Sequence, residues 1–382
     1  MKVINLVPIN NKIVPSKVKE ARTARGLSLA ELSRMIGVSS QAISQYEQGK
    51  ITPSPNILMK LVDELEFPIG FFCDDMSIED YEENIVYFRS HKNITNKLKE
   101  ACKVKIKWIE QTYRIIKDYF ELPMLDLVEF DIDSIEDIDE NMIEELAYKL
   151  RQHWNLSQAP IKNFTALLQE KGFVVTKLMI GTKKVDAFSK WNEGVPYIFV
   201  GADKGSACRL RFDLAHELGH LIMHKKVLSS ELKSDKEVYN KMENQANYFA
   251  GAFLLPIEAF NREVISSSVD NFVILKNKWN VSISAMIKRC QTANILTDNQ
   301  IRYLNSQMIR YHFYKQEPLD DMIPVENPYL FKQAFNILIE NNIFTRESLL
   351  DELKLNADEV IELYSLDKDF FRRSNNILRL IK

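Results

Sequence analysis

The sequence predicts a multidomain protein with an all-α N-terminal domain, an α+β middle domain and an all-α C-terminal module. Its 382 residues exceed the length, about 250 to 300 residues, at which one hydrophobic core stops growing. Apolar residues fall at helical spacing in short capped blocks up to residue 72, whereas helices and short strands alternate between residues 141 and 295. Helical spacing returns after residue 327. We therefore expect domain boundaries that give the ranges 1–75, 76–140, 141–295 and 296–382.

The composition is that of a folded protein, with 46% hydrophobic and 27% charged residues and only 11 Gly and 12 Pro. The four cysteines lie far apart and form no C-x-x-C pair, which favours a reducing compartment over a disulfide scaffold. The N-terminus lacks a secretory h-region, and no stretch approaches about 18 uncharged apolar residues. We expect a cytoplasmic protein with no membrane partner.

Start and stop signals for short helices follow one another along residues 12–72. Ser28 and Glu31 form an S-x-x-E capping box, Ser39 can cap the next helix, and a glycine follows each of the first three helices. The three-residue turn between the second and third helices is typical of a helix-turn-helix. The predicted helices cover residues 15–25, 28–36, 39–48 and 55–65.

The same segment has the charge and polarity of a DNA-binding surface. Eight Lys or Arg residues face three Glu residues between Lys12 and Lys60, an excess of five that could face phosphates. The alternative is a generic helical bundle whose basic residues are simply solvated. Hydroxyl and amide side chains suit the reading of base edges in the major groove, and the exposed start of the third helix carries Ser40, Gln41, Ser44 and Gln45.

Four stretches give this segment a resemblance to the Cro/C1 or XRE family of helix-turn-helix regulators: RGLSLAEL from Arg25, IGVS from Ile36, ISQYEQG from Ile43 and TPS from Thr52. The resemblance implies that Gln41, Ser44 and Gln45 contact bases, while Glu47 and Gly49 are structural. It also implies a double-stranded DNA operator and a homodimer on palindromic half-sites. No residue of the segment alone identifies a dimer surface.

Two oppositely charged stretches follow. Residues 97–118 predict an amphipathic helix with seven basic and three acidic residues, and residues 121–145 hold eleven acidic residues and no basic one. We interpret the acidic stretch as an exposed connector. The basic helix could instead touch DNA or the acidic stretch, or help the chain to dimerise.

The middle domain carries an H-E-x-x-H motif at His216, Glu217 and His220, on a helix predicted over residues 207–224. Residues four apart share one helix face, so both imidazoles can reach one Zn²⁺, while Glu217 can face the open coordination position as a general base. Chance would give this motif in fewer than about one chain in fifty of this length. In the alternative, the two histidines merely cap or pack a helix. The predicted neighbours are helices over residues 144–154 and 161–171 and strands over residues 173–178, 185–189 and 197–200.

A catalytic zinc needs a third protein ligand. Lys226 stands where the metzincin pattern requires His, so that class is excluded. Glu243 begins a second apolar helix that ends at Pro256, and small residues on its face allow close approach to the first helix. His224 is an alternative ligand, but three ligands on consecutive turns of one helix rarely converge tetrahedrally.

The stretches RLRFDLAHELGH and ENQANYFAGAFLLP resemble the ImmA/IrrE family of metallo-endopeptidases over residues 141–295. The resemblance implies a zincin-like metallopeptidase domain with His216, His220 and Glu243 as zinc ligands and Glu217 as the general base. The strand at residues 196–201 could bind an extended substrate at its edge or could be a core strand. Candidates for polarising the scissile carbonyl are Tyr197, Tyr248, His224, Arg209 and Arg211.

Together, the helix-turn-helix segment and the H-E-x-x-H domain predict a DNA-binding transcriptional regulator with a zinc-dependent endopeptidase domain. The predicted substrate is a repressor-type protein or the chain itself, which could be cut in the acidic connector. The alternative is a ligand-sensing regulator in which the peptidase fold is a non-catalytic sensor. The acidic helices predicted over residues 345–353 and 356–363 favour a packing, dimerisation or partner-binding role for the C-terminal module.

Overall fold

The computed structural model describes residues 13–73, 87–88, 95–130, 132, 134–178, 187–201, 206–225 and 236–372. The chain forms two compact units, each built from segments that are distant in sequence. Unit 1 comprises Met1–Asp80, Ile94–Glu121 and Tyr329–Lys382, and unit 2 comprises Tyr81–Asn93 and Leu122–Pro328. Among the residues described, no helix is both long and apolar enough to span a membrane.

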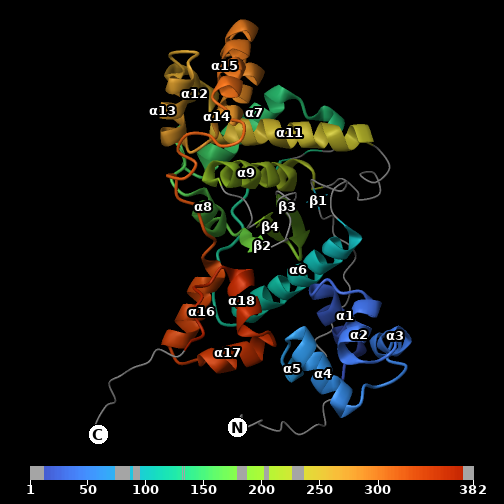
Figure 1. The fold of residues 1–382 in the computed structure, drawn as a ribbon. Helices are drawn as coiled ribbons and strands as arrows, with labels where there is room; N and C mark the ends of the chain where they lie inside the picture. Colours follow the sequence, from blue (N-terminus) through green and yellow to red (C-terminus); the bar gives the residue numbers. More distant parts are fainter. Residues whose placement is uncertain are drawn as a thin grey trace. The chain divides into compact units, whose positions relative to one another are not determined.

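The N-terminal part of unit 1 is the predicted set of short helices (Figure 1). The capping box is confirmed, since Ser28 accepts a hydrogen bond from the Glu31 amide and the Glu31 carboxylate accepts one from the Ser28 amide. Ser39 caps the third helix, and Gly37 ends the second with φ +73°. The helices are α1 (Pro15–Ala24), α2 (Leu29–Ile36), α3 (Ser40–Glu47), α4 (Pro55–Leu65) and α5 (Ile69–Cys73).

The predicted C-terminal module of residues 296–382 is divided between the two units: its residues up to Pro328 belong to unit 2. The part from Tyr329 packs within unit 1, against the N-terminal helices and the basic helix α6 (Asn96–Lys117). The Tyr364 hydroxyl donates to Thr112 Oγ1 at 2.6 Å, and Arg25 pairs with Glu359 at 2.5 Å. Its acidic side chains therefore neutralise basic ones from the N-terminal segments. The part of the module in unit 1 contains α16 (Leu330–Glu340), α17 (Arg346–Leu353) and α18 (Ala357–Tyr364), and the predicted helical stretch beyond Arg372 lies outside the described residues.

Unit 2 contains a four-stranded mixed sheet in the order β1-β3-β4-β2. Strand β3 is antiparallel to both β1 and β4, whereas β2 is parallel to β4. Glu193 (φ +49°) and Gly194 (φ +76°) join β3 to β4 in a two-residue turn of the type that matches strand twist. Strand β4 lies between two others, so it is a core strand and the edge interpretation was wrong. The strands are β1 (Tyr87–Phe88), β2 (Val174–Leu178), β3 (Ala187–Asn192) and β4 (Val195–Gly201).

Two long helices lie in layers beside this sheet: α9 (Ala207–Met223) packs against β3 and β4, and α11 (Lys236–Leu254) packs on α9 (Figure 1). Trp191 Nε1 of β3 donates to the Leu221 carbonyl of α9 at 3.3 Å. A Cβ at Gly219 would lie 3.0 Å from Phe249 of α11, so glycine allows the two helices to approach closely. Helix α11 begins at Lys236, seven residues before the predicted start at Glu243.

The acidic stretch has many exposed residues, but it is also fixed to unit 2 by buried residues, which the interpretation as an exposed connector did not include. Ile132 and Ile138 are 7% and 4% exposed and belong to the core of unit 2, and Asp126 pairs with Lys171 at 2.6 Å. Its interspersed apolar residues give it a buried side. The remaining helices of unit 2 are the 3₁₀-helix η1 (Ile135–Asp137), α7 (Glu140–His153), α8 (Phe164–Glu170), α12 (Ile257–Glu263), α13 (Val269–Trp279), α14 (Ile283–Thr292) and α15 (Asp298–Arg310).

A buried cluster of charged side chains joins α13 and α14 of unit 2 to the segment that carries Glu317 and Asp320. Lys276 is fully buried and donates to Glu317 at 2.9 Å and to Asp320 at 2.6 Å. Glu317 also accepts hydrogen bonds from the amides of Ile283 and Ser284, at the start of α14. Burying a charge is tolerable only when it is paired in this way.

We expect Glu317→Ala to lower the free energy of unfolding by about 3 kcal/mol, because it leaves a buried ammonium group underpaired and uncaps α14. Asp321→Ala is the matched control, since Asp321 is exposed and bonds only to the exposed Gln316 among the contacts described. Chemical denaturation of both variants measures the difference. Equal stability of the two would show that the cluster does not hold these helices.

Candidate metal centre

Helices α9 and α11 bring together three side chains that could hold one metal ion. The Nε2 atoms of His216 and His220 lie 3.0 Å apart, and the Glu243 carboxylate oxygens lie 3.6 Å from His216 Nε2 and 3.4 Å from His220 Nε2. The two imidazoles are buried and the carboxylate is 17% exposed. Among the described residues, this is the cluster of His, Cys, Asp or Glu side chains whose atoms could hold one ion.

This triangle fits a zinc ion. Zinc–nitrogen and zinc–oxygen bonds of about 2.0 to 2.1 Å in a tetrahedron place ligand atoms roughly 3.3 Å apart. The observed separations lie near that value: 3.0 Å between the two Nε2 atoms, 3.4 Å from His220 Nε2 to Glu243 Oε1 and 3.6 Å from His216 Nε2 to Glu243 Oε2. Two imidazoles and one carboxylate also form the donor set of catalytic rather than structural zinc sites, which keep a fourth position open.

A chain of hydrogen bonds through His224 and Gln245 orients His220, and no sequence pattern indicates the role of Gln245. Gln245 donates to the carbonyls of Ile135 and Ile138, both at 2.9 Å, which turns its amide oxygen toward His224 Nε2 at 3.0 Å. Burial, followed by the nearby His220, lowers the pKa of His224 to about 3, so this ring is neutral. With Nε2 donating to Gln245, His224 Nδ1 accepts from His220 Nδ1 at 2.9 Å. The tautomer that results points the His220 Nε2 lone pair at the other ligand atoms.

His216 and Glu217 are each held by one further side chain. His216 Nδ1 lies 3.1 Å from Asn247 Oδ1 of α11, an arrangement that also leaves Nε2 for a metal. Ser189 of β3 donates to Glu217 Oε2 at 2.7 Å, and both residues are buried. His224 is therefore a partner of a metal-binding residue and lies outside the ligand triangle.

Three of the five candidates for polarising a carbonyl have other roles. Tyr197 stacks on Phe199 within the sheet, and Arg211 donates to Glu326 and to the Ile161 carbonyl. His224 lies between His220 and Gln245. Arg209 is exposed at the start of α9, and burial raises the pKa of Tyr248 to about 12.

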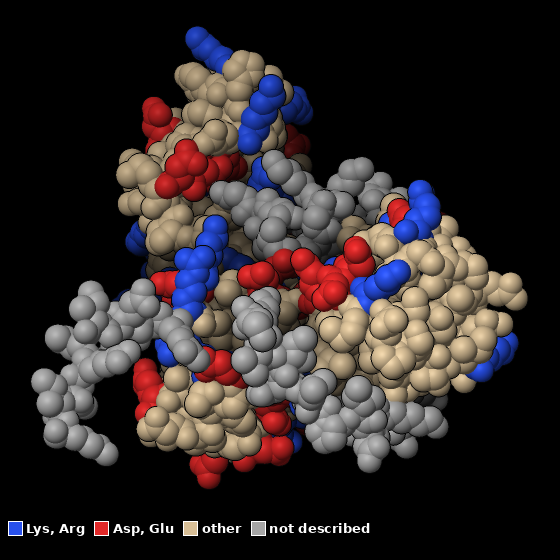
Figure 2. All heavy atoms as spheres, turned by 60° about the horizontal axis from the view of Figure 1, so that its bottom comes forward, with Lys and Arg blue, Asp and Glu red and all other residues tan. Residues whose placement is uncertain are grey.

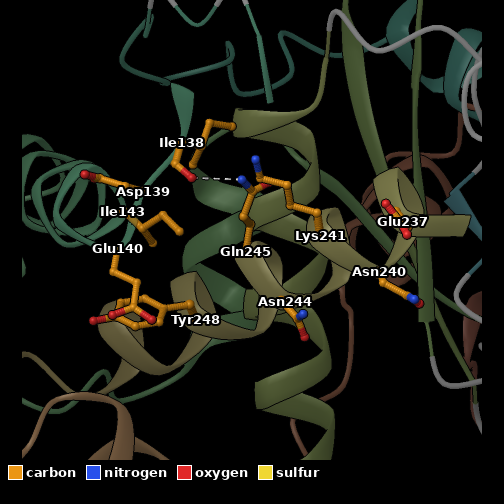
Figure 3. A pocket seen from close by; sticks show the side chains of 10 residues that line it. All are labelled: Ile138, Asp139, Glu140, Ile143, Glu237, Asn240, Lys241, Asn244, Gln245 and Tyr248. Carbon is orange, nitrogen blue, oxygen red and sulfur yellow. Dashed lines mark hydrogen bonds between the residues drawn. The ribbon is translucent and has the colours of Figure 1, made fainter. Parts of the chain in front are cut away.

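Tyr248 lines a pocket of about 500 Å³ between α11 and the start of α7 (Figure 3). Gln245 reaches from α11 across to Ile138 at one end of this pocket. The lining side chains are mostly polar: Asp139, Glu140, Glu237, Asn240, Lys241, Asn244, Gln245 and Tyr248, with Ile138 and Ile143. The pocket and the metal-binding triangle thus share α11, and Gln245 contacts both the pocket and His224.

The predicted base-reading residues lie on the first two turns of α3. Gln41 is exposed, and Ser44 and Gln45 are partly exposed. Ser40 Oγ lies 3.1 Å from Ser33 Oγ of α2, so this hydroxyl helps to join the two helices. Ser44 Oγ accepts a hydrogen bond from Gln48 at 3.1 Å.

The basic surface around α3 is smaller than the sequence count indicated, because several charges are used internally. Arg22 forms two hydrogen bonds with Glu47, at 2.6 and 2.9 Å, which confirms the structural role of Glu47. Lys17 is buried beside Glu20, and Arg25 pairs with Glu359. On the described part of the face in Figure 2, Lys and Arg side chains lie in separate groups among acidic and neutral residues.

These features define a helix-turn-helix protein with an α+β zincin-like domain. Residues 18–72 match the helix-turn-helix family model, and residues 168–291 match the model of the IrrE N-terminal-like domain, which is a peptidase family. The chain therefore carries both of these domains.

Two relatives with similar sequences are named as transcriptional regulators. The chain is 34% identical over 94 residues to an HTH-type transcriptional regulatory protein of Methanocaldococcus jannaschii, covering 23% of this chain and 30% of the relative. It is 38% identical over 63 residues to a transcriptional regulator in the ATPase CF(0) region of Rhodospirillum rubrum, covering 16% of this chain and 58% of the relative. The chain thus spans between about a third and three fifths of these relatives.

A solved Mycobacterium tuberculosis transcriptional regulator is 18% identical, with a TM-score of 0.27 over 39% of this chain and 45% of the regulator. A likeness at this level supports no inference about the metal centre.

We expect Gln245→Leu to weaken zinc binding by about 10- to 100-fold, because His224 loses the acceptor that sets its tautomer and hence that of His220. Asn244→Ala is the control, since Asn244 is the exposed neighbour on the same helix. Competition with a fluorescent chelator measures the affinity, and circular dichroism of the zinc-free proteins checks the fold. An unchanged affinity in Gln245→Leu would show that the hydrogen-bond chain does not orient His220.

Proposed function

We propose that this protein is a DNA-binding transcriptional regulator whose second unit is a zinc-dependent endopeptidase. The ligand triangle of His216, His220 and Glu243, with Glu217 next to it in sequence, is the observation that carries the proposal. The match of residues 168–291 to a peptidase family supports it. A structural zinc site would not need the general base.

In the proposed mechanism of hydrolysis, each residue of the site has a separate role. Bound zinc would supply a Lewis acid and lower the pKa of its water toward about 7. Ser189 donates to one oxygen of Glu217, which fixes the carboxylate's orientation. Glu217 takes a proton from the attacking water and returns it to the leaving amine. His224 and Gln245 keep His220 in the tautomer that binds the metal.

The DNA-binding proposal rests on α3 and its caps. An exposed Gln41 and the partly exposed Ser44 and Gln45 can reach base edges when the start of this helix enters a major groove, with Ser40 at its first position. We infer a double-stranded operator as partner and a homodimer as the binding form. The substrate that we infer for the peptidase is a repressor-type protein or this chain itself.

The pocket beside Gln245 supports a second candidate function, a ligand-sensing regulator without proteolysis. A small polar molecule bound against Gln245 would compete for the amide that holds His224. Ligand occupancy would then alter the metal centre or the packing of α11. We favour the endopeptidase because Glu217, the proposed general base, directly follows the candidate ligand His216 in the sequence.

We expect Glu217→Gln to keep one zinc per chain but to lower peptide hydrolysis by about 10²- to 10⁴-fold, because the amide cannot accept the proton. Glu243→Ala is the complementary variant, which should lose zinc because it removes one of three ligands. Metal analysis and mass spectrometry of a digested protein substrate measure both effects. Full proteolysis by Glu217→Gln would exclude this mechanism, and regulated DNA binding that survives it would favour the sensor.

We expect Gln41→Ala and Gln45→Ala each to cost about 1–3 kcal/mol of discrimination between the operator and its point variants, since each amide can contact base edges. Gln300→Ala, on α15 of the other unit, is the control. Fluorescence anisotropy with operator variants at fixed salt measures the discrimination. If affinity for every sequence falls equally, these side chains do not read bases.

A further inference from the structure

The outer edge of the sheet beside Glu217 is covered by a segment of the same chain. Strand β3 pairs on one side with β4 and on the other with β1, the two residues Tyr87–Phe88. The pairing is antiparallel, with Tyr87 opposite Ser189 and Phe88 opposite Phe188. Without β1, strand β3 would form the edge of the described sheet.

The register places β1 close to the metal centre. Ser189, the partner of Tyr87, is the residue that donates to Glu217 Oε2 at 2.7 Å. Opposite residues in an antiparallel pair have Cα atoms about 4.5–5.5 Å apart. The main chain at Tyr87 therefore runs one strand spacing from the residue that orients the general base.

An extended peptide binds a sheet by adding a strand to its edge, with main-chain hydrogen bonds that are independent of sequence. Strand β1 is held in this way. The sequence around it suits the role, because the run Ile85-Val86-Tyr87-Phe88 has high strand propensity and stands between Glu83 and Arg89. The run also lies between α5 and α6, at the point where a cut would separate the helix-turn-helix from the rest of the chain.

We propose that the stretch carrying β1 is the substrate of the metal centre, cut within the same molecule. The inference rests on the proposed endopeptidase function and adds the identity of a substrate. Glu217 removes a proton from water, and the oxygen of that water bonds to the carbonyl carbon of a peptide bond in this stretch. The C–N bond breaks, its electron pair stays on nitrogen, and Glu217 returns the proton there, which leaves one new carboxyl end and one new amino end.

The full-length chain loaded with zinc tests this directly. We expect denaturing mass spectrometry to find a cut between Cys73 and Thr95, at a rate that does not depend on protein concentration. Glu217→Gln should remain intact. The double variant Tyr87→Pro with Phe88→Pro removes two amide donors from β1, so we expect self-cleavage to slow about tenfold or more.

The matched comparison is Tyr87→Ala with Phe88→Ala, which removes the same two side chains but keeps the amide groups, so the difference between the two double variants isolates the main-chain pairing. Hydrogen exchange in zinc-free protein provides a readout that is independent of catalysis. We expect at least one amide of Ala187–Asn192 to exchange about tenfold faster in the proline variant than in the alanine variant. Equal exchange in the two variants would overturn the pairing and with it the proposal.

The remaining outcomes separate this proposal from the proposed function. A wild-type chain that stays intact while its proline variant digests casein would overturn self-cleavage but leave the endopeptidase. A cut outside residues 73–95, or a rate proportional to protein concentration, would also overturn it. Zinc-loaded protein that cuts neither itself, casein nor a synthetic peptide of residues 81–93 would overturn both.

Discussion

The close packing of α9 on α11 is the constraint on which the metal centre depends. His216 and His220 lie on one helix and Glu243 on the other, so their atoms converge only if the two helices approach closely. Gly219 permits that approach, because a Cβ there would meet Phe249 at 3.0 Å. The site also lies in a buried layer, where an unpaired polar group costs about 1–3 kcal/mol. Because the two imidazoles are buried, each needs a hydrogen-bond partner at Nδ1: Asn247 for His216 and His224 for His220.

Local signals in the sequence predicted much of the fold. Capping residues placed α2 and α3 correctly, and Pro55 and Leu65 are the observed ends of α4. The spacing of His216 and His220 predicted a shared helix face, and small residues on the second helix predicted its approach to the first. These features depend on residues within a few turns of one another, where geometry is nearly fixed by the helix itself.

The missed features are those that join distant parts of the chain. The sequence gives no signal for the role of Gln245, which becomes visible only when its Nε2 lies 2.9 Å from the carbonyl oxygens of Ile135 and Ile138. The count of basic residues overestimated the phosphate-facing surface, because Arg25 meets Glu359, 334 residues later. The edge and core interpretations of β4 both stayed open, because its neighbours on either side are set by tertiary pairing. Propensity cannot show which strands lie side by side.

The two-unit division determines what a cut near β1 would do. The helix-turn-helix would lose its covalent link to α6, yet Trp108 Nε1 would still donate to Glu20 at 2.6 Å and Arg25 would still pair with Glu359. A tether keeps such partners at an effective concentration in the millimolar range, whereas separate fragments associate only as their bulk concentration allows. Hydrolysis would therefore convert a permanent association into one that falls apart on dilution. At concentrations below the dissociation constant of the two fragments, the DNA-binding helices would then separate from the rest of the chain.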